Sequence, residues 1–128
     1  MHRQNCGASL SRKAPEATEA AIQRAVLDHL RWRAKTGWLF WATPNAGKRS
    51  PWLGADLRKQ GMTAGVGDLS LVSPTGHYHE LELKTPTGRL RPAQRERLEL
   101  LQAAGVPSDV AYGLDSALAI LAGWGAIA

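Results

Sequence analysis

Asp68, Glu82 and Lys84 are spaced so that a β-hairpin would bring their side chains together. The residues on either side of the Pro/Gly-containing segment 73–76 form two short strand patterns joined by a turn. If that turn is centred on Thr75, Asp68 lies opposite Glu82, with Cβ atoms roughly 5 Å apart. Lys84 follows Glu82 by two residues and projects from the same face. Because opposed carboxylates repel each other, the pattern predicts a cation between them.

Carboxylates without imidazole or thiolate neighbours select hard cations rather than zinc, so the predicted ion is Mg²⁺, with Mn²⁺ as a substitute. Asp68 and Glu82 are the predicted side-chain ligands, and the backbone carbonyl of Leu83 is a further candidate. An ion held in this way supplies an activated water and neutralises charge at a phosphate. Lys84 can orient or help deprotonate the water, or stabilise the pentacovalent charge. The predicted chemistry is phosphodiester cleavage.

Length and composition limit the alternatives. The chain has 128 residues, 44% of them hydrophobic, which is typical of one globular domain. Its net charge of +5 favours a polyanionic partner, although a basic soluble protein without such a partner fits equally well. With Cys6 as the only cysteine, no internal disulfide is expected. Residues 1–13 lack the apolar run of a signal peptide and no stretch has the length of a membrane span, so a cytoplasmic protein is expected.

The remaining patterns predict a mixed central sheet flanked by helices, an α/β fold. Residues 1–14 are expected to form a flexible basic tail and residues 15–128 a single domain. The hairpin is antiparallel, whereas the strand–helix–strand pattern from Tyr78 to Tyr112 predicts parallel strands. The first helix is predicted from Pro15 or Glu16 to about Lys35, and further helices over residues 51–60 and 92–104. A last helix is predicted over about residues 117–124, capped by Asp115 or Ser116. The other predicted strands are residues 38–43 and 108–112.

Several residues have two interpretations. Glu19 lies on the predicted buried stripe of the first helix, either as an acid that favours the helix N-terminus or as a third acid aimed at the sheet. Tryptophans 32, 38 and 41 are expected in the core rather than as base-stacking platforms. The basic loop 44–50 either clamps phosphate or is a solvated connection.

Two segments resemble a known nuclease family. They are Gly65-Val66-Gly67-Asp68-Leu69 and the run Glu80-Leu81-Glu82-Leu83-Lys84-Thr85-Pro86-Thr87-Gly88-Arg89-Leu90-Arg91-Pro92-Ala93-Gln94. Together with segment 19–23 and Pro44-Asn45, they resemble the VRR-NUC family of the PD-(D/E)xK, restriction-endonuclease-like superfamily. The resemblance covers about residues 15–112 and is closest to short, stand-alone members found in phages and bacteria. Many members have proline at the position of Gly67, which leaves the backbone beside Asp68 freer here.

The resemblance implies a role for each matching residue. Glu19 matches the helix acid, which favours its functional interpretation and makes it a further candidate ligand. Asp68 matches the metal aspartate, Glu82 and Lys84 the Glu-x-Lys pair, and Gln94 a glutamine on the following helix. The expected catalytic set is therefore Glu19, Asp68, Glu82, Lys84 and Gln94. The expected DNA-binding residues surround the site: Asn45, Lys48, Arg49, Arg58, Lys59, Arg89 and Arg91.

The function expected from these residues is a Mg²⁺-dependent DNA endonuclease, in a bacterial or phage-infected cell. Stand-alone relatives act as homodimers on branched DNA, including four-way junctions. One alternative is a non-catalytic DNA-binding protein with the same fold. The presence of the complete expected catalytic set argues against it. Another is a sequence-specific restriction-type endonuclease, which the lack of a separate target-recognition segment disfavours.

Overall fold

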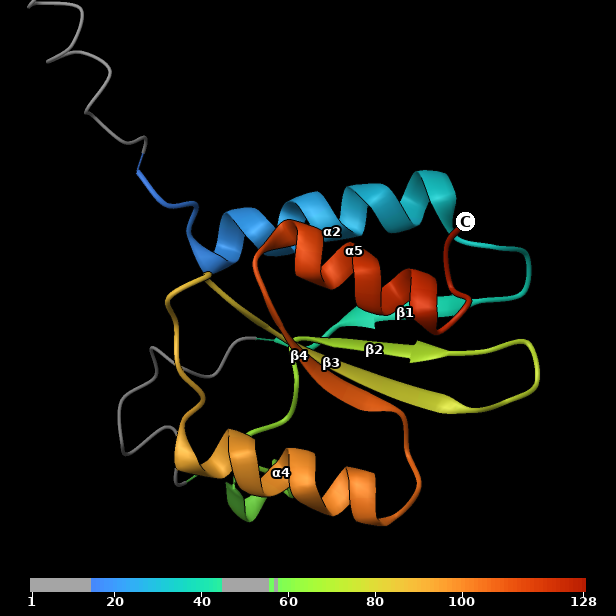
Figure 1. The fold of residues 1–128 in the computed structure, drawn as a ribbon. Coiled ribbons are helices and arrows are strands. Elements are labelled where there is room, and N and C mark those ends of the chain that lie inside the picture. Colours follow the sequence, from blue (N-terminus) through green and yellow to red (C-terminus); the bar gives the residue numbers. More distant parts are fainter. Residues whose placement is uncertain (1–14, 45–55, 57) are drawn as a thin grey trace, which may run out of the picture.

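A four-stranded sheet lies between helices α2 and α5 on one face and helix α4 on the other (Figure 1). The computed structural model describes residues 15–44, 56 and 58–128. It confirms the predicted α/β class with a mixed sheet. The elements, in chain order, are α2 (Glu19–Arg33), β1 (Leu39–Ala42), β2 (Leu69–Val72), β3 (Tyr78–Lys84), α4 (Pro92–Ala103), β4 (Ser108–Tyr112) and α5 (Leu114–Gly123).

The strands follow the order β1-β2-β3-β4. Strand β2 pairs antiparallel with both β1 and β3, whereas β3 and β4 are parallel and connected through α4. Leu69 lies opposite Leu81 and Ser70 opposite Glu80, which is the register predicted from a turn at Thr75. Because side chains alternate between faces, this register sends Leu81 and Leu83 to one side of β3 and Glu80, Glu82 and Lys84 to the other.

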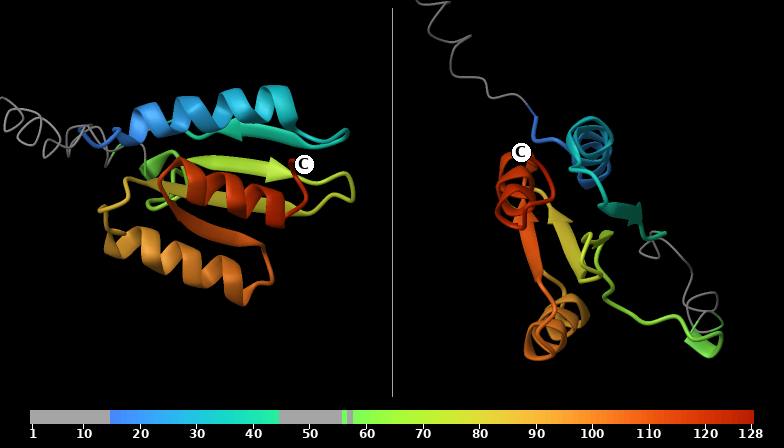
Figure 2. Two further views of the ribbon diagram at one scale, coloured as in Figure 1. Left: turned by 45° about the horizontal axis from the view of Figure 1, so that its top comes forward. Right: turned by 90° about the vertical axis from the view of Figure 1, so that its right-hand side faces the viewer.

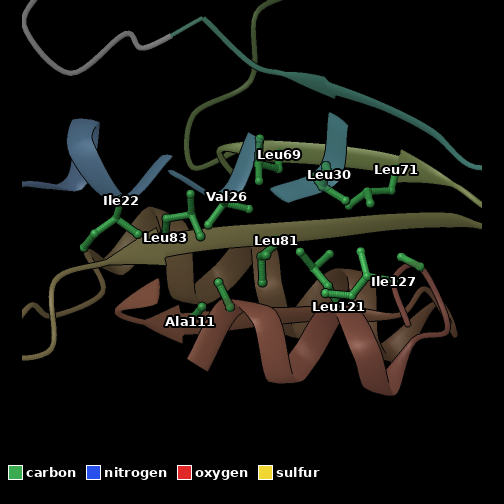
Figure 3. Close-up of a cluster of buried hydrophobic side chains, with 12 residues drawn as sticks. Ile22, Val26, Leu30, Leu69, Leu71, Leu81, Leu83, Ala111, Leu121 and Ile127 are labelled. Carbon is green, nitrogen blue, oxygen red and sulfur yellow. The ribbon is translucent and has the colours of Figure 1, made fainter. Parts of the chain in front are cut away.

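The apolar face of the sheet packs against α2 and α5 (Figure 3). Ile22, Val26 and Leu30 recur at helical spacing and form the buried stripe of α2. They meet a layer of buried side chains from the strands, α5 and the C-terminal segment: Leu69, Leu71, Leu81, Leu83, Ala111, Ala117, Leu121, Ala126 and Ile127. Each fully buried leucine contributes about 2 kcal/mol. This packing fixes the position of β3 from its apolar face.

Two predicted helix starts are wrong. Helix α2 begins at Glu19 rather than at Pro15 or Glu16, because the Thr18 hydroxyl accepts from the Ala21 amide and caps the first turn. Helix α5 begins at Leu114. Its N-cap residue is Gly113, with φ of 96°, and not Asp115 or Ser116 as predicted. The Ser116 hydroxyl instead accepts from the Tyr112 amide.

The predicted core position of the tryptophan cluster is also wrong in part. Trp38 packs against the core, but Trp32 is 89% exposed on α2 and Trp41 is 47% exposed on the edge strand β1. Both side chains lie on faces that no described element covers. The end-on view shows α4 beneath β3 and β4, away from β1 (Figure 2).

Some predicted features lie outside the described residues. These are the tail 1–14, the basic loop with Asn45, Lys48 and Arg49, and most of the helix predicted over 51–60. Of that helix, Asp56, Arg58 and Lys59 are described and have helical backbone.

Candidate active site

Asp68 and Glu82 come together at the C-terminal end of β3. Asp68 directly precedes β2, and its Oδ2 accepts a hydrogen bond of 2.7 Å from the Leu83 amide. The carboxylate of Asp68 is therefore held against the backbone of β3, next to Glu82. The carbonyl predicted as a ligand belongs to this same Leu83. The hairpin register thus brings the two acids together. If the register is continued by one residue beyond β2, Asp68 lies opposite Glu82, and opposed residues are close neighbours.

Glu82 is buried and has two polar neighbours from the predicted set. The residue is only 8% exposed. Gln94 Nε2, on the first turn of α4, donates to Glu82 Oε1 over 3.0 Å. Lys84 Nζ lies 3.9 Å from the same oxygen, and Lys84 is itself only 4% exposed. Strand β3 and helix α4 therefore place an acid, a lysine and an amide around one point.

The pKa of Glu82 is raised to about 9. Burial is the main cause, followed by the charge of Asp68 and a hydrogen bond between the two side chains. The Lys84 ammonium opposes this shift, and Glu19 adds to it slightly. Burial and the neighbouring Asp68 charge therefore favour the protonated form of Glu82 at neutral pH, because like charges this close oppose the ionisation of Glu82.

The donor set fits a hard divalent cation. Asp68 and Glu82 would hold it, since carboxylate oxygens are the ligands that Mg²⁺ prefers, and the ion would displace the proton that Glu82 binds in its absence. No group of three or more His, Cys, Asp and Glu side chains gathers in a metal-binding geometry among the described residues. Among the described residues, Asp68 is the acid whose side chain contacts Glu82.

The structure places Glu19 differently from the two central acids. Glu19 is the first residue of α2 and is exposed. It does not join Asp68 and Glu82 in a three-residue ligand group. Its charge nevertheless contributes to the raised pKa of Glu82, so it faces the same region. It also lies in the first turn of α2, where a carboxylate favours the helix dipole.

The described basic residues of the predicted DNA-binding set are exposed. Arg89 and Arg91 lie between β3 and α4, and Arg58 and Lys59 lie in the segment that precedes the hairpin. The Arg91 amide donates to Gln94 Oε1 over 2.8 Å. Gln94 therefore links the loop between β3 and α4 to Glu82. Glu16 also holds this loop, because its carboxylate accepts from the amide and hydroxyl of Thr87.

Comparison with known proteins identifies the family. The profile of the VRR-NUC domain matches residues 17–115, which contain all of the site residues described above. The chain belongs to the VRR-NUC domain family. This is a nuclease-type family, and the assignment confirms the resemblance seen in the sequence. No helix among residues 15–44 and 58–128 is long and apolar enough to cross a membrane.

Solved structures share the fold of this VRR-NUC domain. One is a "VRR_NUC domain protein" with a TM-score of 0.72 and 21% identity, covering 87% of this chain and 90% of its own. A second, a "VRR_NUC domain", has a TM-score of 0.57 and 19% identity, covering 83% of this chain and 97% of its own. No curated protein matches the chain.

Sequence reasoning missed a second buried acid in this VRR-NUC domain. Glu80 lies two residues before Glu82 on the same face of β3, and Arg97 on α4 pairs with it. Two patterns could have indicated this pair. An acid on a buried strand face needs a basic partner, and Arg97 follows Gln94 by three residues on the inner face of α4.

Gly67 is also less free than the sequence suggested. Its amide donates to Glu80 Oε2 over 2.9 Å. A Cβ at this position would lie 2.8 Å from Glu80 Cγ and 3.1 Å from the Leu81 carbonyl oxygen, so only glycine fits without a shift. The backbone directly before Asp68 is therefore held against β3.

Proposed function

We propose that this VRR-NUC domain is a Mg²⁺-dependent DNA endonuclease, with Mn²⁺ as a substitute ion. It acts on branched DNA such as four-way junctions, as a homodimer. The observation that supports this proposal is the meeting of Asp68, Glu82 and Lys84 at the end of β3. A buried glutamate that lies beside a second carboxylate and a buried lysine is costly unless it serves a charged ligand.

Each residue of the site has a separate task in this reaction. When bound, the metal ion supplies an activated water and neutralises charge on the phosphate. Asp68 and Glu82 hold the ion, and Gln94 orients Glu82 through its amide. Lys84 Nζ, in a water-poor environment, orients the nucleophile or stabilises negative charge as it develops.

The proposed substrate and assembly follow from symmetry and charge. A four-way junction has two-fold symmetry, and cutting two opposed strands requires two active sites, which a C2 homodimer supplies. Arg58, Lys59, Arg89 and Arg91 are exposed basic residues in segments that lead to or from the site. They can contact phosphates without reading sequence, which suits a nuclease that recognises DNA shape.

The decisive experiment compares four DNA substrates of matched sequence: linear duplex, nicked duplex, flap and four-way junction. We expect cleavage with Mg²⁺ or Mn²⁺, none with EDTA, and the fastest cleavage of the branched forms, because shape rather than sequence is recognised. Denaturing gels report the cuts. Light scattering of the protein on uncut junctions in EDTA should show two protomers on each junction.

Each of the other outcomes would favour a different function or assembly of this protein. Binding to DNA without cleavage in either metal would favour a non-catalytic DNA-binding protein. Cleavage at one sequence of linear duplex would favour a restriction-type enzyme. A protein that stays monomeric both free and on the junction would contradict the homodimer.

The salt dependence of binding tests the basic residues in the loop between β3 and α4. DNA affinity should fall steeply with salt, because each phosphate contact releases a counterion. Arg89→Gln should reduce the slope of log affinity against log salt by about 1. Fluorescence anisotropy in EDTA measures this without cleavage. Arg31→Gln is the matched control, since Arg31 is exposed on α2 and pairs with Asp28. Equal slopes for Arg89→Gln and the wild type would show that Arg89 does not contact DNA phosphates.

A further inference from the structure

The buried carboxylate of Glu80 has a partner for each of its acceptor positions. Its Oε2 accepts from the Gly67 amide at 2.9 Å and from Arg97 Nε at 3.1 Å. Its Oε1 accepts from Arg97 Nη2 at 2.9 Å and from the Tyr78 hydroxyl at 2.6 Å. A carboxylate offers about four acceptor positions, so Glu80 is saturated by protein donors.

This saturation separates Glu80 from Glu82, although the two acids share one face of β3. Glu82 accepts one hydrogen bond from α4, through Gln94, and its nearest cation is 3.9 Å away. It keeps acceptor positions for a metal ion. Glu80 keeps none, and the bidentate fork of Arg97 balances its charge. Glu80 is therefore not a further ligand, and its tie to Gly67 has another consequence.

We propose that Glu80 is the positioning residue for the metal-binding carboxylates: anchored by Arg97, it holds the Gly67 amide and so sets Asp68 beside Glu82. This inference rests on the proposed function of the site. Gly67 is covalently joined to Asp68, so a hydrogen bond at its amide fixes the backbone from which the Asp68 side chain projects. The bond from the Leu83 amide to Asp68 Oδ2 then fixes the far end of that side chain. Asp68 is thus held at two points, both of which lie against β3.

Helix α4 contributes to both acids at once. Gln94 reaches Glu82, and Arg97, one turn later, reaches Glu80. Because the two contacts come from one helix, α4 orients the positioning carboxylate and the ligand carboxylate together, while β3 sets their spacing. Partners that orient metal ligands typically affect metal affinity by about 10–100-fold when they are removed.

The test uses Glu80→Gln, which keeps the shape but removes the charge that pairs with Arg97 and replaces one of the two acceptor oxygens with an NH2 group that cannot accept a hydrogen bond. Two readouts are taken without DNA. Isothermal titration with Mn²⁺ and Mg²⁺ should show metal affinity weakened about 10–100-fold. Hydrogen exchange followed by NMR should show the Gly67 amide losing protection, while the Leu71 and Leu81 amides keep theirs.

Two further variants separate positioning from general stability. Val26→Ala removes core packing behind the sheet, so it should lower the melting temperature while leaving metal affinity and the Gly67 amide unchanged. Arg97→Lys keeps the charge but loses the bidentate fork, and should weaken metal binding less than Glu80→Gln does. Arg97→Lys also serves as the test variant if Glu80→Gln does not fold, with the same two readouts.

The outcomes distinguish this inference from the proposed function. If the wild-type protein binds neither metal, the metal-dependent function fails, and the positioning role fails with it. If the wild type binds metal and Glu80→Gln binds it equally well, only the positioning role is overturned. Equal weakening in Val26→Ala would likewise overturn it, because general destabilisation would then explain the loss.

Discussion

Glu82→Gln is expected to abolish metal-dependent cleavage while leaving binding of junction DNA unchanged. The substitution keeps the buried shape and the contact with Gln94 but removes one of the two carboxylates that would hold the ion. Lys84→Ala should reduce cleavage about 10²–10⁴-fold, the usual range for a positioned acid–base group. Neither side chain is expected to dock phosphate, because both are buried.

The measurement pairs single-turnover cleavage of a four-way junction with anisotropy of the same junction in EDTA. Glu99→Gln is the matched control, since Glu99 is an exposed acid on α4 outside the site. Its cleavage and binding should equal those of the wild type. Cleavage by Glu82→Gln at the wild-type rate would show that the nuclease site lies elsewhere.

The second large effect is a dependence of stability and metal binding on pH, set by the raised pKa of Glu82. The folded protein holds this proton more tightly than the unfolded chain, whose glutamate has its ordinary pKa of 4.5. Above pH 4.5, folding therefore takes up a proton, and metal-free stability falls as pH rises toward about 9. Metal binding releases the same proton, so affinity should rise up to tenfold per pH unit in this window.

Thermal unfolding between pH 7 and 9, in EDTA and in Mg²⁺, measures this linkage. That range lies above the titration of His79, whose pKa is lowered by burial and whose effect on stability appears below its ordinary value of 6.5. Without metal, the wild-type melting temperature should fall with pH. Mg²⁺ at 100 times its dissociation constant should restore about 2.7 kcal/mol, or roughly 10 °C for a domain of this size.

Asp68→Asn is the matched variant for the pH prediction. It removes the charge that helps to raise the pKa of Glu82, so in EDTA it should melt above the wild type, with a weaker dependence on pH. It should gain little from Mg²⁺, because one ligand is gone, and the two melting curves should approach or cross as Mg²⁺ rises. An unchanged response to Mg²⁺ in Asp68→Asn would exclude Asp68 from the metal site.

Local patterns in the chain determined the hairpin, its register and the strand–helix–strand unit that follows. The alternation of leucines with Glu80, Glu82 and Lys84 has a period of two, so the burial of one face left a single register for Asp68. Pro92 and Gly105 mark the ends of α4, because proline suits a first helical turn and glycine a residue beyond the last. These signals depend on near neighbours, and they sufficed to bring Asp68, Glu82 and Lys84 together.

Only the tertiary structure decided features that depend on what packs against each face. Trp32 and Trp41 are exposed because no described element covers their sides of α2 and β1, and hydrophobicity alone predicted the reverse. The raised pKa of Glu82 arises from burial and from Asp68, which directly precedes β2. The donors to Glu80 come from α4 and from the segment before β2. A pattern within one strand carries no information on such donors, since they come from residues distant in the chain.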